Sequence, residues 1–284
     1  MQYSQSGRFE RIKVLGQGAF GRVYLVSDNW DGQRYALKCF EKERVVKNNE
    51  QQLVLDEEAI HSSLTSNFVV NLVAAFDDLS HVCFLMEVCV AGDLAALIVK
   101  RGGFNEREAS FYMRCIMEGL DYIHAKNIVH RDLKPENVFI DGKGYAKIGD
   151  FGLAKKITPG EKEYGWCGTV PYMAPEMLEY RGYDSSFDLW SLGAIIYQML
   201  SGKLAFDGKD STEIENKIKK GISITIHMDD EFKDIINSLC HMNPAHRLVA
   251  YQTQVRSTYY YTLWNDISTL NVQPPFSITP YFVL

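Results

Sequence analysis

The sequence predicts an α+β fold of two unequal lobes, with a small β-rich lobe over residues 9–89 and a larger, mostly helical lobe over residues 90–262. Short runs rich in β-branched and aromatic residues dominate the first part, and helical periodicity dominates the second. The 284 residues are 46% hydrophobic, which is enough to build a substantial core. We therefore expect a globular, two-lobed molecule.

Four strands are predicted in the first lobe, from the runs FERIKVLG, RVYLVSD, RYALKCF and VCFLMEV, which are separated by turn residues. A helix interrupts them between about residues 48 and 64. Leu53, Glu57, Ile60 and Leu64 recur there with helical spacing and form one stripe. This stripe places a carboxylate among apolar residues, where it needs a partner of opposite charge.

In the second lobe the pattern predicts helices near residues 105–125, 186–201, 211–220 and 230–240. Between the first two lies IVHRDLKPENVFI, in which charged residues are enclosed by two apolar runs. Its charges could lie in water, as in an ordinary surface hairpin, or they could face a ligand. The rest of the chain has to decide between these alternatives.

A glycine-rich turn, GQGAFGRV, connects the first two predicted strands through Gly16, Gly18 and Gly21. Glycines allow backbone N–H groups to approach phosphate oxygens without interference from Cβ. The same spacing fits a dinucleotide-binding turn, but that reading requires a helix to begin at the last glycine. Residues 22–26 continue as a strand, which favours a phosphate-covering hairpin.

The run YALK adds a lysine to this lobe. Ala36 and Lys38 point to the same face of a strand, so a small residue and an ammonium group can share one site. A lone lysine usually lies on the surface. Because Glu57 also needs an opposite charge, we expect Lys38 and Glu57 to form a pair.

Composition excludes several classes of protein. The formal net charge of −6 argues against nucleic-acid binding by bulk electrostatics. The six cysteines show no CxxC spacing, which is typical of reduced thiols. We find no secretory signal and no apolar stretch of membrane-spanning length. These features predict a soluble protein of the cytoplasm, with access to the nucleus left open.

Six motifs then occur in the order found in protein kinases: GQGAFGRV, YALK, HRDLKPEN, DFG, APE and DLWSLG. The chain resembles this family over residues 9–249. The resemblance implies the two-lobed protein kinase fold and a transfer of phosphate from ATP with Mg²⁺. The charges of HRDLKPEN would then face a bound nucleotide.

The resemblance also implies a role for each motif residue. Asp132 is similar to the base that orients the substrate hydroxyl, and Lys134 to the residue that neutralises the transferred phosphoryl group. Lys38, held by Glu57, would contact the α and β phosphates. Asn137 and Asp150 would bind magnesium. The implied nucleotide-binding residues are Leu15, Gly16, Gln17, Gly18, Ala19, Phe20, Gly21, Arg22, Val23, Ala36, Lys38, Met86 as gatekeeper, Glu87 and Cys89 at the hinge, Glu136 and Phe139.

Other residues imply the substrate class. Lys134, together with Thr169 before Pro171, resembles the serine/threonine branch of the family, and Leu153 after DFG resembles enzymes that prefer serine. Protein substrates are therefore implied. Asp93 and Glu136 match acidic positions that bind arginine upstream of the phosphorylated residue, whereas Gln198 departs from the usual glutamate. Arginine three positions upstream is the expected preference.

Two segments are similar to the AGC group, which contains the cyclic-nucleotide-dependent kinases and the protein kinase C relatives. One joins Lys38 to Glu57, and the other is LWNDISTLNVQPPFSITP, in residues 263–284, which resembles the start of an AGC C-terminal extension. Calcium/calmodulin-dependent kinases are the alternative branch. Because the sequence ends before the hydrophobic motif of AGC tails, the expectation is that the domain either works without this motif or receives it from a regulatory subunit or other partner.

Several positions depart from the pattern. Gly165 occupies the place of the activating phosphothreonine, so Arg131 and Lys155 would face no phosphate there. Glu161 or Glu163 could substitute for the phosphate, or Thr158 or Tyr164 could be phosphorylated instead.

His61 falls where an apolar residue usually completes the regulatory spine, and its ring would be neutral and packed above its usual pKa of about 6.5. Glu176 and Arg247 are expected to form a structural ion pair. The rival functions are a pseudokinase scaffold that transfers no phosphate and a small-molecule kinase of related fold. Against the first, Lys38, Asp132 and Asp150 are all present.

Overall fold

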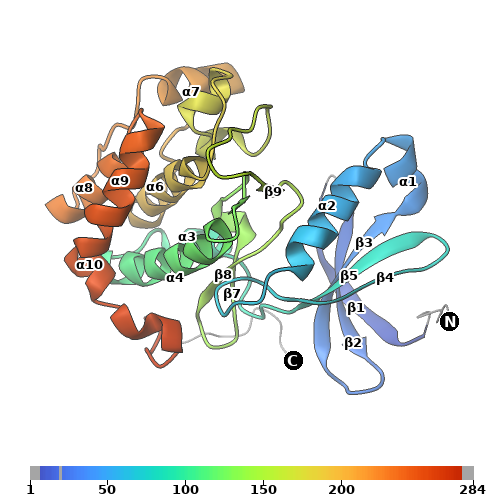
Figure 1. The fold of residues 1–284 in the computed structure, drawn as a ribbon. Helices are drawn as coiled ribbons and strands as arrows, with labels where there is room; N and C mark the ends of the chain where they lie inside the picture. Colours follow the sequence, from blue (N-terminus) through green and yellow to red (C-terminus); the bar gives the residue numbers. More distant parts are fainter. Residues whose placement is uncertain (1–6, 19–20, 277–284) are drawn as a thin grey trace.

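The computed structural model describes residues 7–18 and 21–276, and the two predicted lobes are evident in it (Figure 1). The N-terminal lobe is built on one antiparallel sheet with the strand order β1-β2-β3-β5-β4. Its strands are β1 (Phe9–Gln17), β2 (Arg22–Asp28), β3 (Arg34–Glu41), β4 (Leu72–Asp77) and β5 (His81–Glu87). The sequence did not predict β4, an edge strand whose central alanines carry little β signal.

Two helices follow β3 in the N-terminal lobe, α1 (Lys42–Lys47), which was not predicted, and α2 (Gln51–Ser62). The predicted stripe on α2 is partly wrong. Leu53 is 40% exposed, whereas Val54, one position further, is buried with Glu57 and Ile60. Leu64 is buried beyond the end of the helix. The register of the buried face therefore differs by one residue at its start, and Glu57 keeps its buried position.

Among the described residues, the C-terminal lobe contains the four predicted helices and four other α-helices. The predicted ones are α4 (Glu106–His124), α6 (Ser186–Ser201), α7 (Ser211–Ile218) and α8 (Asp230–Leu239), and the others are α3 (Leu94–Arg101), α5 (Pro175–Leu178), α9 (Pro244–Thr253) and α10 (Tyr259–Thr262). A capping box begins α4, since Asn105 and Glu108 each accept a hydrogen bond from the backbone N–H of the other. Most of α4 and α6 is buried, and the two form the centre of this lobe.

Short paired strands flank the HRDLKPEN loop. β6 (Ile128–Val129) pairs with β9 (Lys155–Lys156), and β7 (Val138–Ile140) pairs with β8 (Ala146–Ile148). The predicted HRDLKPEN loop runs from β6 to β7 and includes one turn of 3₁₀ helix at Pro135–Asn137. Two β-pairs thus fix the ends of this loop on the side of the C-terminal lobe that faces the sheet (Figure 1).

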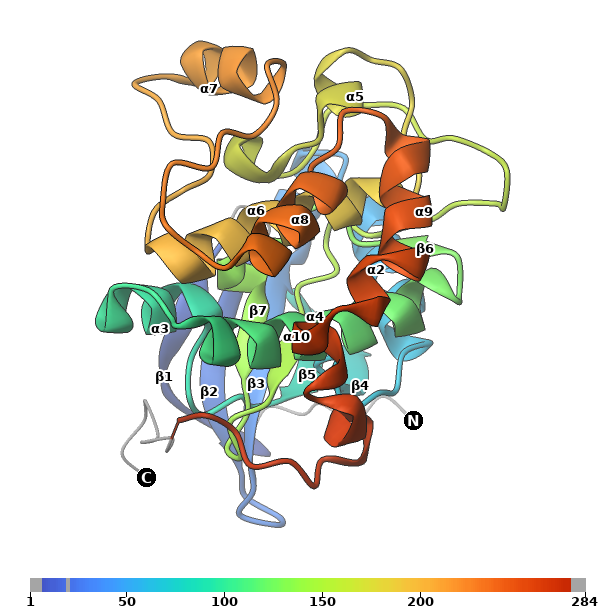
Figure 2. The same ribbon diagram turned by 90° about the vertical axis from the view of Figure 1, so that its left-hand side faces the viewer.

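After α10 the chain runs alongside α4 (Figure 2). Trp264 is buried there, and its indole N–H donates to the Ser110 hydroxyl at 2.8 Å. Arg101 lies over the ring of Phe276 at 4.3 Å, and the Tyr145 hydroxyl donates to the carbonyl of Val272. The assignment of residues 263–284 as an AGC extension stays a prediction, and residues 277–284 lie outside the described part. Within the part described, no helix combines the length and apolarity needed to span a bilayer.

Candidate active site

The glycine-rich turn joins β1 to β2 as a hairpin, with Gly16 opposite Val23 and Gln17 opposite Arg22. Because Arg22 begins a strand, the dinucleotide-binding alternative is excluded. Gly21 has a structural reason to be glycine, since a Cβ there would lie 2.3 Å from the backbone oxygen of Cys39. The hairpin therefore rests directly on β3. The predicted nucleotide-binding residues Ala19 and Phe20 lie outside the described residues.

Lys38 lies between two carboxylates. Its ammonium nitrogen is 2.7 Å from Glu57 Oε1 on α2 and 2.9 Å from Asp150 Oδ1 of the DFG motif. The predicted Lys38–Glu57 pair is therefore present, and Asp150 joins it from the other lobe. Burial alone would lower the pKa of Lys38, but the two carboxylates outweigh it and raise that pKa. Lys38 is therefore firmly charged, whereas burial raises the pKa of its partner Glu57.

Phe151 fills the space between α2 and the catalytic loop. Its side chain is fully buried, with the His61 ring centroid 5.0 Å away and that of His130 5.3 Å away. His61 donates from Nε2 to the carbonyl of Val70 at 2.7 Å, and burial lowers the pKa of its ring. His61 thus packs as a neutral ring at the position where the family usually has an apolar residue.

The charges of the HRDLKPEN loop converge on Asp132. Lys134 lies 2.9 Å from its Oδ2, and the Thr169 hydroxyl donates to its Oδ1 at 2.7 Å. Lys134 also donates to that hydroxyl at 2.8 Å, so the three side chains form a closed network. The loop is therefore not a hairpin with its charges in water. It holds a carboxylate and an ammonium group together at the face of the lobe.

Asp188 on α6 fixes the backbone of this loop, a role that the sequence did not reveal. It is fully buried and accepts hydrogen bonds from the backbone N–H groups of His130 at 2.9 Å and Arg131 at 3.0 Å. His124 contacts the same carboxylate at 2.7 Å. Burial would raise the pKa of Asp188, but these bonds hold it below its usual value. They also stabilise the positive φ of Arg131, a backbone conformation that residues other than glycine rarely adopt.

Asn137 and Asp150 are brought together by a backbone bond from the Gly149 N–H to the Asn137 carbonyl, at 2.9 Å. The Asn137 side-chain amide donates to the backbone and carboxylate oxygens of Asp132, so its own side-chain oxygen points the other way. The Asp150 side chain is 47% exposed. Desolvation by the surrounding protein atoms would raise the pKa of Asp150, but the neighbouring Lys38 lowers it overall, so Asp150 is a carboxylate.

Two protein oxygens of this kind fit Mg²⁺, which takes hard ligands and usually keeps nucleotide phosphates and water as the others. Across the residues that the structure describes, no group of three or more His, Cys, Asp or Glu could hold a metal alone.

Comparison with known proteins agrees with this geometry. A family model described as "Protein kinase domain" matches residues 9–259. The chain belongs to the protein kinase family. Its relatives include cGMP-dependent protein kinase 2 of Homo sapiens, 40% identical over 256 residues, which are 87% of this chain and 33% of that protein.

Two further relatives have similar names. The cGMP-dependent protein kinase, isozyme 2 forms cD5/T2, of Drosophila melanogaster is 40% identical over 84% of this chain and 26% of its own length. The cGMP-dependent protein kinase egl-4 of Caenorhabditis briggsae is 35% identical over 94% of this chain and 37% of its own length. This kinase domain thus spans about a third of the curated relatives it matches. The predicted kinase fold and AGC branch are confirmed.

The hinge of the kinase domain follows β5. Met86 pairs with Ala36 across the sheet, so the gatekeeper and the small residue of YALK are neighbours. Glu87 is held in place, since its carboxylate accepts from the Asn71 N–H at 2.7 Å and from Lys147 at 2.8 Å. Burial raises the pKa of the Cys89 thiol to about 12.

Phe139 lies on β7, in the other lobe, so the predicted nucleotide-binding residues come from both lobes. The contacts of Ala36, Met86, Glu87, Cys89 and Phe139 with the nucleotide stay a prediction. The same holds for Leu15, Gly16, Gln17, Gly18, Gly21, Arg22, Val23 and Glu136.

The activation segment contains Gly165, at φ +124°. Lys155 forms an ion pair with Glu163 at 2.7 Å, while Glu161 is exposed. Arg131, which was expected to face no phosphate, has other hydrogen-bond partners. Its guanidinium donates to the Leu153 carbonyl at 2.6 Å and to the Tyr183 hydroxyl at 3.1 Å.

Tyr183 also pairs with Glu163 through two backbone hydrogen bonds, each 2.9 Å long. Tyr183 therefore connects the HRD arginine to the residue that neutralises Lys155. This role could not be predicted from the sequence, because Tyr183 lies outside every motif.

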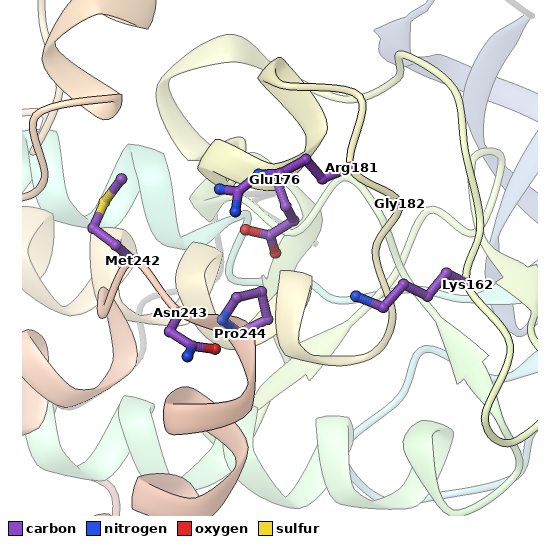
Figure 3. Close-up of a pocket in the computed structure, with 7 residues that line it drawn as sticks. All are labelled: Lys162, Glu176, Arg181, Gly182, Met242, Asn243 and Pro244. Atoms are coloured by element: carbon purple, nitrogen blue, oxygen red, sulfur yellow. The ribbon is translucent and has the colours of Figure 1, made fainter.

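The expected ion pair between Glu176 and Arg247 is present and fully buried. Beside it is a pocket of about 520 Å³, into which Lys162 extends from the activation segment (Figure 3). The pocket is lined by Lys162, Glu176, Arg181, Gly182, Met242, Asn243 and Pro244. None of these belongs to the predicted nucleotide site, so this hollow lies apart from the phosphate-handling residues.

The acidic positions expected to bind arginine differ in availability. Asp93 accepts the backbone N–H of Ala96 at 2.7 Å and thereby caps α3. Glu136 is exposed on the catalytic loop. The side-chain oxygen of Gln198 accepts from the Tyr172 hydroxyl at 2.6 Å. Of these two acidic residues, Glu136 is therefore the more exposed.

Proposed function

We propose that this kinase domain transfers the γ-phosphoryl group of ATP to serine or threonine hydroxyls of protein substrates. The observation that carries the proposal is the convergence of Glu57, Lys38 and Asp150 across the two lobes, beside the network of Asp132, Lys134 and Thr169. Phosphoryl transfer needs positioning and charge neutralisation more than covalent help, and these groups supply both.

Each side chain has one task in this proposal. Mg²⁺, held by Asn137 and Asp150, would neutralise phosphate charge. Lys38, fixed by Glu57, binds the α and β phosphates. The Asp132 carboxylate orients the substrate hydroxyl and takes its proton, while Lys134 stabilises the charge on the transferred group. Thr169 holds both of these residues, and Phe151 keeps Asp150 in place.

The preferred substrates follow from Glu136, whose carboxylate is exposed. Glu136 would bind an arginine three positions upstream of the phosphorylated hydroxyl, because charge-assisted pairs of guanidinium and carboxylate are strong and geometrically specific. Asp93 contributes less, since it already caps α3. Gln198 carries no charge, so selectivity for a second arginine is weaker.

Regulation and location belong to the same proposal. A regulatory subunit or segment would supply the hydrophobic motif, and the printed names of the relatives, which are cGMP-dependent, make a cyclic-nucleotide-responsive partner the first to test. All six cysteines are free thiols, which supports a reducing compartment such as the cytoplasm.

The test is transfer of radiolabelled phosphate from Mg-ATP to matched peptides with and without arginine three positions upstream. We expect transfer to the arginine peptide, and a loss of at least about 10²-fold in Asp132→Asn, the size of effect that a positioned base contributes. Glu136→Gln should remove the arginine preference and keep the transfer. Nucleotide binding without transfer would identify a pseudokinase scaffold, and transfer to small hydroxyl compounds alone would identify a small-molecule kinase.

A further inference from the structure

Two thiols lie side by side in the N-terminal sheet. Cys39 on β3 is directly opposite Cys83 on the antiparallel strand β5. Their sulfur atoms are 3.3 Å apart, and the two residues are 4% and 5% exposed. Neither takes part in phosphoryl transfer as derived above. Direct cross-strand pairing keeps the two side chains on one face of the sheet, so their proximity is built into the register.

That face is the one opposite Lys38. Side chains alternate along a strand, so Lys38 points toward α2 while Cys39 points away from it. The layer around the sulfurs consists only of strand side chains, with Val26, Leu37 and Leu85 buried beside them and Phe9, Tyr24, Tyr35 and Phe76 partly exposed over them. No helix contributes to this cluster among the residues described. A single layer of side chains therefore separates the sulfurs from solvent, and a small oxidant has a short path to them.

The two thiols are not equivalent. The S–H of Cys83 donates to the Cys39 sulfur. This hydrogen bond lowers the pKa of the Cys39 thiol and raises that of Cys83, and the nearby Arg11 guanidinium favours the Cys39 thiolate further, against burial, which raises the pKa. Arg11 is held on this face by stacking on the Tyr24 ring at 4.3 Å. Cys39 is thus the better nucleophile, and Cys83 is placed to react with it second.

We propose that Cys39 and Cys83 form a redox-sensitive pair, which hydroperoxides convert into a cross-strand disulfide that weakens nucleotide binding. The Cys39 thiolate attacks one oxygen of hydrogen peroxide, which breaks the O–O bond and gives a sulfenic acid and hydroxide. The Cys83 sulfur then attacks the Cys39 sulfur and expels its oxygen as water. In total two thiols and one hydrogen peroxide give one disulfide and two waters, and a thiol reductant reverses the change.

The effect on the nucleotide follows from the neighbours of Cys39. A disulfide holds its sulfurs at about 2.05 Å, so the present separation has to shrink by about 1.2 Å. Cys39 directly follows Lys38, and its strand pairs with Arg22 at the end of the glycine-rich turn. The Cys39 carbonyl also contacts the Cα side of Gly21. A shift of β3 at this point therefore moves both the lysine and the turn that are to hold the phosphates. This second step depends on the proposed function, whereas the chemical step does not.

The chemical step is tested on the whole chain. The reduced protein is treated with hydrogen peroxide, quenched in acid, unfolded, alkylated and analysed by peptide mass spectrometry. We expect a cross-linked pair of peptides containing Cys39 and Cys83, lighter by two hydrogens and absent after reduction. Cys115 and Cys240 are matched controls, because burial raises the pKa of both thiols and should keep them reduced. If the Cys39–Cys83 pair oxidises no faster than these two, the proposal is wrong.

Variants separate the two thiols. In Cys83→Ala, Cys39 should stop at the sulfenic acid, which dimedone traps. In Cys39→Ala, Cys83 should be oxidised more slowly than Cys39 in the reciprocal variant. Equal rates in the two variants would contradict the assignment of Cys39 as the attacking thiol. The cross-link in the unmodified chain remains decisive even if a variant folds poorly.

The functional step is measured by direct binding of a fluorescent ATP analogue to oxidised and reduced protein. We expect oxidation to weaken binding about tenfold, which corresponds to about 1.4 kcal/mol. Cys83→Ala, oxidised in the same way, should bind as the reduced protein does. Unchanged affinity in cross-linked protein would overturn this step. If the reduced protein binds no nucleotide, the proposed function fails while the cross-linking result stands.

Discussion

His61 shows at the residue scale how one substitution in a family pattern is accommodated. A histidine at this position is tolerated because its Nε2–H donates to the Val70 carbonyl and its ring packs at a tilt against Phe151. Its Nδ1 is buried without a hydrogen-bond partner, so a proton added there would have no acceptor. Protonation would therefore oppose the packing that keeps Asp150 next to Lys38.

This predicts a pH-dependent stability. Burial lowers the pKa of His61 in the folded state, so the unfolded state binds the proton more readily. The free energy of unfolding should therefore fall as pH drops below about 6.5, by at most about 1.4 kcal/mol per pH unit from this one group. His61→Leu should have a shallower slope of melting temperature between pH 7 and pH 5.5. Parallel slopes for the two proteins would show that His61 does not contribute.

At the scale of elements, the activation segment is held by two contacts that contain no phosphate. One is the ion pair of Lys155 with Glu163, and the other is the hydrogen bond from Arg131 to Tyr183. Because Glu163 and Tyr183 also pair through their backbones, the two contacts support each other. The segment can thus keep its position before any modification.

We therefore expect dephosphorylated protein, checked by mass spectrometry, to retain its kinase activity. Glu163→Gln should lower it by about fivefold, because a partly exposed ion pair contributes up to about 1 kcal/mol. Tyr183→Phe removes the hydroxyl that receives the Arg131 hydrogen bond and should act in the same direction. Glu161→Gln is the matched control, since that side chain is exposed. An inactive dephosphorylated protein, or equal losses from both glutamate variants, would contradict this account.

Motifs predicted the elements that carry chemistry better than the elements that support them. Lys38, Glu57, Asp132 and Asp150 could be placed because each belongs to a pattern with a known chemical requirement. On α2 the sequence predicted that Leu53 is buried, whereas Val54 is the buried residue. Both are apolar, so the helical pattern alone does not distinguish them. β4 and α1 were missed because short, partly exposed elements have weak periodicity.

Supporting residues were missed for a different reason. Asp188 and Tyr183 act through hydrogen bonds with residues more than 50 positions away, and no local pattern reports such contacts. The pairing of Cys39 with Cys83 likewise depends on the register between β3 and β5. The sequence shows where each cysteine lies along the chain, but it does not show how far apart the two thiols lie in the fold.

For the molecule as a whole, the segment after α10 links distant parts of the C-terminal lobe. Trp264 packs edge-on against Phe111 of α4, with 5.1 Å between ring centroids, and Val272 accepts a hydrogen bond from Tyr145, next to β8. The segment therefore connects the central helix to the β7–β8 hairpin, whose start carries Asn137 and whose end leads to Asp150. Its packing supports the magnesium-binding side of the site from behind.

Truncating the anchor of this segment should destabilise the entire domain. Trp264→Ala removes a buried indole and its hydrogen bond to Ser110, which we expect to cost about 3–5 kcal/mol in the free energy of unfolding. Trp264→Phe keeps part of the ring packing and should cost clearly less. Urea unfolding followed by circular dichroism measures both. A loss below about 1 kcal/mol in the alanine variant would mean that the segment is only loosely attached.

The backbone at Gly165 limits how this enzyme can be re-engineered. At φ +124° a residue with a β-carbon is strained whatever space surrounds it. With threonine at this position, the loop would have to change its backbone conformation before a phosphate on the threonine could contact Arg131. That arginine already donates a hydrogen bond to the Tyr183 hydroxyl. Introducing the activating phosphothreonine of similar kinases would therefore require replacing the whole segment between DFG and APE. A single substitution at Gly165 would not suffice.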